Sequence, residues 1–156
     1  MRVPPRLWTV GHSRHAIDRL IELLEGQGIA CLVDVRRIPF SRRHPQHNKE
    51  ALGEALARRG IEYVWEGEAL GGKRDWGEVR ASPAFGEALG RLKERARAAP
   101  TAILCAEEDP RRCHRLHLVS AAWAERWGEE IFHIRGDGRV ERHGEVVPQP
   151  GLFGRE

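Results

Sequence analysis

The stretch TAILCAEEDPRRCHR, residues 101–115, joins an apolar run to the start of a helical pattern. Thr101 to Cys105 predicts a buried strand, and Asp109 followed by Pro110 is typical of the start of a helix. The segment from Cys105 to Arg115 contains two thiols, three carboxylates, a histidine and three arginines. A connection needed only for folding does not require this mixture. The stretch therefore indicates a strand–helix unit and a functional site.

The same alternation of strand and helix extends outward in both directions. Apolar runs predict further strands at 7–10, 30–35, 61–65 and 130–134. Helix starts are indicated by Ser13, Asn48 and the pair Ser82-Pro83, each followed by apolar residues at helical spacing. Gly136-Asp137-Gly138 predicts a tight turn into a last strand over 139–143.

This pattern predicts an α/β fold: one three-layer domain with a mostly parallel five-stranded sheet and a C-terminal hairpin strand. We expect the domain to span residues 1–145, with 146–156 as a loosely held tail. The expected strand order is 3-2-1-4-5, which makes the first and fourth strands neighbours. Gly11-His12-Ser13 then faces Cys105-Ala106-Glu107, with Asp34 and Arg36 one strand away, at the edge where such sheets bind ligands.

Composition narrows the class of protein. The 156 residues are 40% hydrophobic and 31% charged, which is typical of a soluble globular domain. No segment approaches the roughly 20 apolar residues of a membrane span, and the N-terminus lacks the apolar core of a signal peptide. Three cysteines are too few for a disulfide framework, and Cys31 reads as a small core residue. We expect a cytoplasmic protein with no membrane partner.

Arginine supplies nearly all of the positive charge, because lysine occurs only at Lys49, Lys73 and Lys93. Arginine suits bidentate binding of phosphate and carboxylate. Genomic base composition explains an arginine excess equally well. With a net charge of +3, the chain permits an anionic small molecule or a nucleic acid as partner without requiring either.

Familiar cofactor motifs are missing, and no cofactor is expected. The first strand is not followed by a dinucleotide-binding glycine pattern, and the chain has no phosphate-binding loop and no Cys-x-x-Cys pair. His114 and His117 lie three residues apart on a predicted helix, but their spacing is not diagnostic of zinc. No metal site is predicted.

Two kinds of catalytic group compete in the central stretch. Glu107 and Asp34, at the ends of strands, could act as general acid, general base or nucleophile, or could instead form structural ion pairs with nearby arginines. Cys113, placed about four residues into the predicted helix, could be a nucleophile. A buried, inert cysteine is the alternative.

Anion binding is a further interpretation of the same edge. The predicted helix start at Asp109 offers free N–H groups, although Asp109 itself would occupy some of them. Arg36, Arg42 and Arg115 lie on loops or helix starts nearby. Trp123 and Trp127 fit the buried face of the last helix, whereas Trp76 is the better candidate for stacking on a ligand.

Several motifs together resemble a known family. In order they are Gly11-His12-Ser13, Asp34-Val35-Arg36 with Pro39, Ser41 and Arg42, Leu70-Gly71-Gly72, the CAE to CHR stretch, and His133-Ile134 with Asp137-Gly138. This set resembles the domain of unknown function 488 family over about residues 7 to 140. The resemblance implies a compact α/β domain and no particular reaction. The residues that match its motifs are His12, Ser13, Asp34, Arg36, Ser41, Arg42, Gly71, Gly72, Cys105, Glu107, Cys113, His114 and Arg115.

The leading hypothesis is a small enzyme, a hydrolase or transferase, that acts on a phosphate-bearing substrate such as a nucleotide or nucleic acid. The expected catalytic residues are Glu107, Asp34, His12 and Cys113. The expected substrate-binding residues are Ser13, Arg36, Ser41, Arg42, Gly71, Gly72, His114 and Arg115. The rival hypothesis is a non-catalytic module that binds nucleic acid or a protein through the same arginines.

Overall fold

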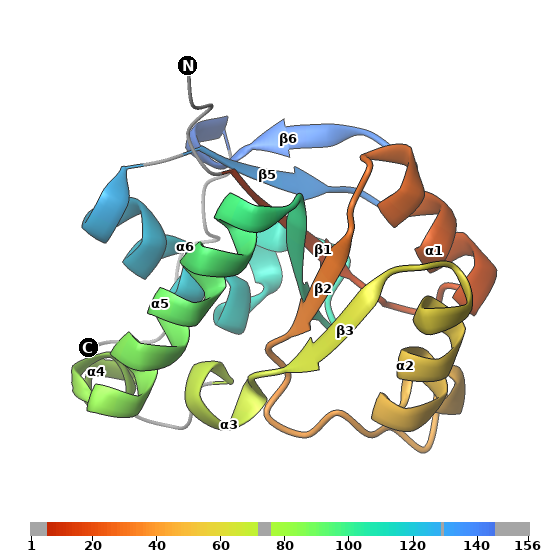
Figure 1. Ribbon diagram of the computed structural model, residues 1–156, viewed down its shortest axis with the longest axis horizontal. Helices are drawn as coiled ribbons and strands as arrows, with labels where there is room; N and C mark the ends of the chain where they lie inside the picture. The colour runs from red at the N-terminus through yellow and green to blue at the C-terminus, as the bar shows by residue number, and fades with distance from the viewer. Residues whose placement is uncertain (1–5, 72–75, 129, 146–156) are drawn as a thin grey trace.

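Six strands form one sheet between two layers of helices (Figure 1). The computed structural model describes residues 6–71, 76–128 and 130–145, and of residues 76 and 114–117 the backbone alone. The strands are β1 (Leu7–Gly11), β2 (Cys31–Asp34), β3 (Glu62–Trp65), β4 (Thr101–Cys105), β5 (Ile131–Ile134) and β6 (Val140–Arg142). The helices are α1 (Ile17–Gly26), α2 (Lys49–Arg58), α3 (Gly67–Leu70), α4 (Trp76–Ala81), α5 (Pro83–Ala98) and α6 (His114–Trp127).

The sheet order is β3-β2-β4-β1-β5-β6, and all neighbours are parallel except the antiparallel hairpin β5–β6. The predicted α/β class, mostly parallel sheet and C-terminal hairpin strand are confirmed. The predicted order 3-2-1-4-5 is wrong, because β4 lies between β2 and β1. These three strands are all nearly continuous apolar runs, so their patterns do not decide which of them occupies which inner position.

The core has one layer on each face of the sheet. Side chains alternate along each strand, so Leu32 packs with α1 and α2 while Val33 packs with α5 and α6. Trp123 is fully buried in the second layer, and its ring meets Trp127 edge-on with centroids 5.1 Å apart. The predicted core roles of Trp123 and Cys31 are confirmed.

Helix starts follow the predictions in part. The Ser82 hydroxyl accepts a hydrogen bond from the Phe85 backbone N–H at 3.2 Å, as expected of a cap. Ser13, by contrast, caps nothing: α1 begins at Ile17, with Ala16 in the N-cap position. The expected helix at Asp109 is a 3-10 turn over Pro110–Arg112, followed by an extended Cys113 and then α6. Cys113 therefore precedes the helix instead of lying inside it.

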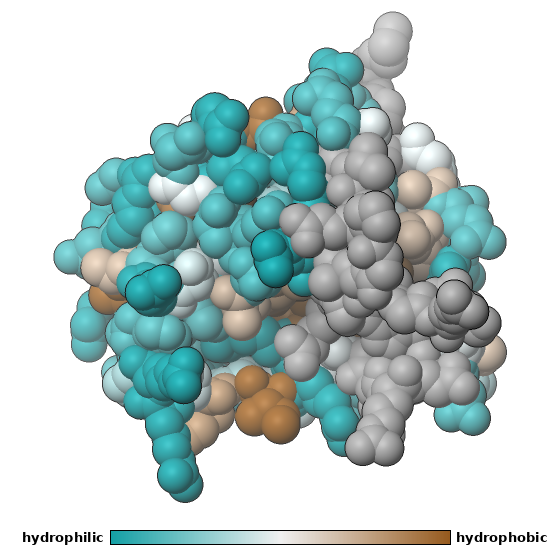
Figure 2. All heavy atoms as spheres, turned by 180° about the vertical axis from the view of Figure 1, so that it is seen from behind, coloured by the Kyte–Doolittle hydropathy of each residue, from teal (hydrophilic) through white to brown (hydrophobic). Residues whose placement is uncertain are grey.

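The molecular surface seen from behind is mainly hydrophilic, with a strongly hydrophobic group at its lower edge (Figure 2). Among the described residues, the large hydrophobic side chains that are exposed are Ile38, Phe40 and Val140. None of the helices in the described part of the chain has the length and apolar character needed to cross a membrane.

Candidate functional site

The carboxyl ends of β1 and β4 meet as the sequence predicts. Gly11 pairs with Cys105 in the sheet, and the pairing continues beyond both strands. The His12 N–H donates to the Cys105 carbonyl and the Ser13 N–H donates to the Ala106 carbonyl, each at 2.9 Å. These bonds hold the segment after β1 directly against the segment that carries Glu107.

Gly11 allows this close approach. A Cβ at this position would overlap the backbone carbonyl oxygen of Glu107. Because that oxygen belongs to the main chain, it cannot rotate away as a flexible side chain would. Only glycine at position 11 therefore allows the backbone of Glu107 to lie directly against the end of β1.

Above these strand ends lies a cavity of about 370 Å³, which we call the β1–β4 hollow. Its walls come from the turn after β1, the loop between β2 and α2, and the loop after β4. The lining residues are His12, Ser13, Arg14, Arg36, Ile38, Phe40, Ser41, Arg43, His44, Ala106 and Glu107. Five predicted site residues are thus brought together: His12, Ser13, Arg36, Ser41 and Glu107.

His12 is held as a neutral ring. It is 4% exposed, and its Nδ1–H donates to the Ser13 carbonyl at 2.9 Å, so Nε2 carries the lone pair. Burial lowers the pKa of His12 to about 4. The ring stacks on buried His47 with centroids 4.5 Å apart, and burial lowers the pKa of His47 as well. His12 therefore lines the hollow as an uncharged imidazole, and its ring is stacked on the uncharged ring of His47, which is not part of the lining.

Ser13 has a φ of +45°, in the left-handed region that residues other than glycine rarely adopt. This conformation accompanies the hydrogen bond between its carbonyl and the His12 ring. Backbone strain of this kind tends to persist at functional sites, where neighbouring contacts enforce it.

Asp34 and Arg36 form a buried ion pair beneath the hollow. Asp34 Oδ1 accepts from the Arg36 backbone N–H and Nε–H, at 3.0 and 2.9 Å. Oδ2 accepts from Arg36 Nη2 at 2.7 Å and from the Tyr63 hydroxyl at 2.5 Å. Arg36 Nη2 also donates to the His47 carbonyl at 2.8 Å. These contacts favour the structural interpretation of Asp34, whose oxygens are already engaged.

The three consecutive acids after β4 have separate surroundings. Glu108 pairs with Arg135 at 2.8 Å, and that contact lowers the pKa of Glu108. Asp109 accepts from the Arg111 backbone N–H at 3.0 Å and closes the 3-10 turn. Glu107 is exposed, lines the hollow, and forms no ion pair with any other described residue. Its carboxylate is therefore available for chemistry.

Two arginines in the hollow were not singled out from the sequence. Arg14 and Arg43 line it, and neither is paired with a carboxylate in the ranges that the structure describes. Predicted Arg42 is exposed but is not part of the lining. The sequence does not show which of two neighbouring arginines, Arg42 or Arg43, lines the hollow, because this depends on the path of the loop.

Other predicted site residues lie elsewhere. Cys113 is buried on the α6 side of the sheet, with its Sγ 2.8 Å from Cys105 Sγ. Gly71 is buried, and a Cβ there would come within 2.7 Å of the Arg37 Cα, so it supports the loop after β2 from below. Gly72 falls outside the described residues, as do the side chains of His114 and Arg115. Within the described residues no group of three or more metal-ligating side chains converges.

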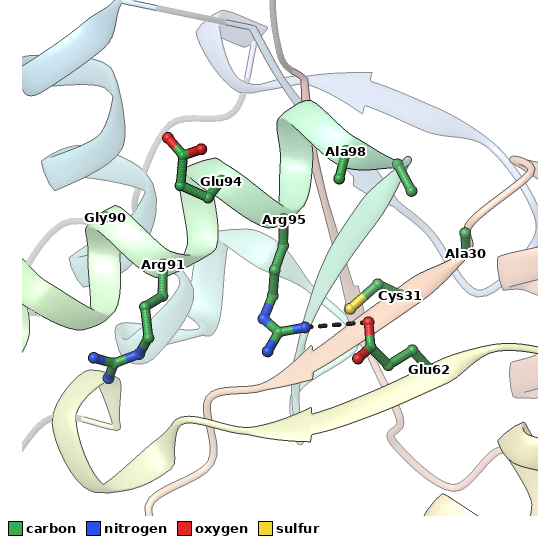
Figure 3. A pocket seen from close by; sticks show the side chains of 9 residues that line it. Ala30, Cys31, Glu62, Gly90, Arg91, Glu94, Arg95 and Ala98 are labelled. Carbon is green, nitrogen blue, oxygen red and sulfur yellow. Dashed lines mark hydrogen bonds and ion pairs between the residues drawn. The ribbon is translucent and has the colours of Figure 1, made fainter.

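A second, larger hollow of about 740 Å³ lies at the amino ends of β2 and β3, beside α5 (Figure 3). Its charged groups are already matched: Arg95 pairs with Glu62 at 3.1 Å and Arg91 with Glu66 at 2.7 Å. Burial raises the pKa of Cys31, which lines it, to about 11. It contains none of the predicted site residues. The smaller β1–β4 hollow is therefore the better candidate site.

Comparison with known proteins identifies a family for this chain. The family model described as "Domain of unknown function DUF488" matches residues 16–79 and 73–122. No curated protein and no solved structure matches the chain. The matched residues include β2 and the loop after it, β4 and Glu107, and most of α6.

Proposed function

The chain belongs to the DUF488 family, and we propose that it is a small enzyme whose substrate carries a phosphate and binds in the β1–β4 hollow. The observation that carries this proposal is the charge of the lining. Arg14 and Arg43 face one carboxylate, Glu107, while Arg36 is neutralised by Asp34. A cavity with this excess of positive charge favours a phosphate group.

Binding of the phosphate is assigned to side chains with donors to spare. The planar guanidinium groups of Arg14 and Arg43 can each donate two parallel hydrogen bonds to phosphate oxygens. The hydroxyls of Ser13 and Ser41 add neutral donors from two walls of the hollow. Arg36 supports the shape of the site through its bonds to Asp34 and His47, and holds no phosphate itself.

Glu107 is assigned the proton transfers. Its carboxylate takes a proton from a water molecule as the water oxygen attacks phosphorus, and the bond from phosphorus to the leaving oxygen breaks. The same proton then passes to the leaving oxygen, so an ester and water give an alcohol and a phosphate. The neutral Nε2 of His12 accepts a hydrogen bond from the attacking water. A hydroxyl in place of water makes the reaction a transfer.

The rim of the hollow favours a nucleotide or nucleic acid. Ile38 and Phe40 are 68% and 63% exposed and lie between Arg37 and Arg42 in the loop after β2. An exposed aromatic ring can stack on a nucleobase while neighbouring arginines bind the phosphate of the same nucleotide. Stacking of this kind is worth about 1–3 kcal/mol per base. The same patch supports the second candidate function, a module that binds single-stranded nucleic acid without turnover.

Replacement of Glu107 by glutamine tests the enzymatic proposal. Hydrolysis of a nitrophenyl phosphate monoester and of the corresponding diester is followed by release of nitrophenolate. Glu107→Gln is expected to lower kcat by about 10²–10⁴-fold, because the amide cannot take up the proton. The matched control is Glu54→Gln, an exposed residue on α2 outside the hollow. Wild-type turnover that survives in Glu107→Gln contradicts the assignment.

The two candidate functions separate in a binding assay. A labelled single-stranded oligonucleotide that binds steeply less well as salt rises, binds Glu107→Gln equally, and is never cleaved supports the binding module. Cleavage that depends on Glu107 supports the enzyme. Under both, Phe40→Ala should weaken the affinity for an oligonucleotide about 5–150-fold, as loss of one stacked base predicts, and leave inorganic phosphate binding unchanged.

A further inference from the structure

Cys105 and Cys113 lie in direct sulfur–sulfur contact. Cys105 ends β4, and Cys113 is the residue before α6. Their Sγ atoms are 2.8 Å apart, against about 2.05 Å in a covalent disulfide. Both residues are thiols, and their exposed fractions are 0% and 5%. Two thiols fixed at this separation need little movement to become bonded.

We infer that this pair is a redox modification site, which closes to a disulfide when the protein meets a hydroperoxide and reopens with a dithiol. The bond would close a ring over residues 105–113, the loop that carries Glu107. Cys105 already touches that loop, since its thiol donates to the Glu107 carbonyl at 3.4 Å.

Cys113 is the thiol that reacts first. It has the greater exposure of the two and lies at the N-terminus of the 14-residue helix α6, where the helix dipole favours an anion. Its thiolate attacks one peroxide oxygen, the O–O bond breaks, and the departing hydroxide takes up a proton as water. This step leaves a sulfenic acid on Cys113.

Cys105 completes the reaction as the resolving thiol. Its sulfur attacks the Cys113 sulfur, the S–O bond breaks, and the hydroxyl leaves with the thiol proton as a second water. In sum, two thiols and one hydroperoxide molecule, here hydrogen peroxide, give one disulfide and two waters. A dithiol reductant reverses the change by exchange and is itself oxidised to a disulfide.

The third cysteine provides an internal control. Cys31 starts β2 and pairs with Thr101 at the amino end of β4, whereas Cys105 lies at the carboxyl end of β4. It lines the α5 hollow beside the Arg95–Glu62 pair (Figure 3). Burial raises the pKa of this thiol to about 11, so it stays protonated and unreactive near neutral pH.

The test is a count of thiols in the full chain before and after hydrogen peroxide. The protein is treated while folded, then denatured, alkylated and weighed by mass spectrometry. Reduced protein is expected to take up three alkyl groups, one per cysteine, and oxidised protein one, on Cys31. Trypsin cuts after Arg111 and Arg112, between the paired cysteines, so the disulfide appears as peptide 98–111 joined to peptide 113–115. Dithiothreitol should restore all three thiols.

Variants assign the bond. Cys31→Ser should still lose both remaining thiols, whereas Cys105→Ser and Cys113→Ser should each abolish the joined peptide. The wild-type count stands even if one of these variants fails to fold. Three alkylated thiols after oxidation, a bond that includes Cys31, linkage only between two chains, or conversion of Cys113 to sulfinic acid without a bond would each overturn the inference.

Discussion

At the scale of single residues, the fully buried Asp34 carboxylate serves to hold the loop after β2 in place. It accepts hydrogen bonds from Arg36 and from the Tyr63 hydroxyl, and Arg36 passes one on to the His47 carbonyl. The backbone of the hollow's wall is thereby tied to the end of β2. A buried pair of this kind mainly affects stability, because either partner alone is an uncompensated charge.

Asp34→Asn should therefore lower the free energy of unfolding by about 3–5 kcal/mol, since it leaves the Arg36 guanidinium buried without its counter-charge. Chemical denaturation measures the loss. Asp137→Asn is the matched control, because Asp137 forms its ion pair with Arg139 on the surface. Equal stability of Asp34→Asn and wild type would show that the pair does not hold the loop.

His12 makes stability depend on pH. Its pKa in the folded chain is about 4, against an ordinary value of 6.5, because burial disfavours the charged ring. Between these two values the unfolded chain binds a proton that the folded chain does not. The free energy of unfolding therefore falls as pH is lowered from 6.5 toward 4, and His12 accounts for about 3 kcal/mol of the loss.

The measurement is the urea midpoint as a function of pH in wild type and in His12→Gln. Between pH 6.5 and 4 the stability of the variant should fall less steeply than that of wild type, because its unfolding takes up about one proton fewer. Part of the slope should remain, since the pKa values of His15, His47 and His143 are also lowered. Identical pH profiles would mean that His12 is charged in the folded chain.

At the scale of elements, the junction of β1 and β4 shapes the site, and Gly11 is its critical position. Gly11→Ala places a methyl group against the Glu107 carbonyl, so the two segments must separate. We expect a loss of unfolding free energy of about 1–3 kcal/mol, the range for overpacking, together with loss of activity. Gly90→Ala on α5 is the control: it meets nothing within 4 Å and should stabilise the helix by about 0.5–1 kcal/mol. Unchanged stability in Gly11→Ala would contradict the close approach.

The elements themselves could largely be predicted from the sequence. The apolar runs and the cap at Ser82 locate strands and helices, because spacing reflects burial directly. Sheet order could not be predicted, since β1, β2 and β4 share one pattern. Short α3 and α4 were missed in a charged, glycine-rich stretch where no apolar period is long enough to see. The helix cap predicted at Ser13 is wrong because the backbone of Ser13 forms a turn, although its hydroxyl is suited to capping.

The candidate site was predictable only to the level of its walls. Strand ends located His12, Ser13 and Glu107 because parallel strands end at one edge. Whether a charged residue faces solvent or a partner depends on contacts between loops distant in sequence. For that reason the sequence does not distinguish Arg36, which is paired with Asp34, from Arg14 and Arg43, which have no described carboxylate partner.

At the scale of the whole molecule, two hollows lie at opposite ends of the parallel strands and differ in charge. The larger one beside α5 has its arginines paired with glutamates, whereas the β1–β4 hollow keeps Arg14 and Arg43 without a described carboxylate partner. We propose that a phosphate-bearing ligand binds in the second of these, the β1–β4 hollow. The two hollows are far enough apart in the fold for a residue-resolved measurement to distinguish them.

That measurement is a titration with adenosine monophosphate followed by the backbone amide signals of the labelled protein in NMR. We predict that the signals of Ser13, Arg14, Arg43, His44 and Glu107 shift together with one dissociation constant. Arg43→Ala should raise that constant, whereas Arg58→Ala, on the exposed side of α2, should not. Shifts confined to the α5 hollow, around Cys31 and residues 90–99, or no shifts at all, would contradict this proposal.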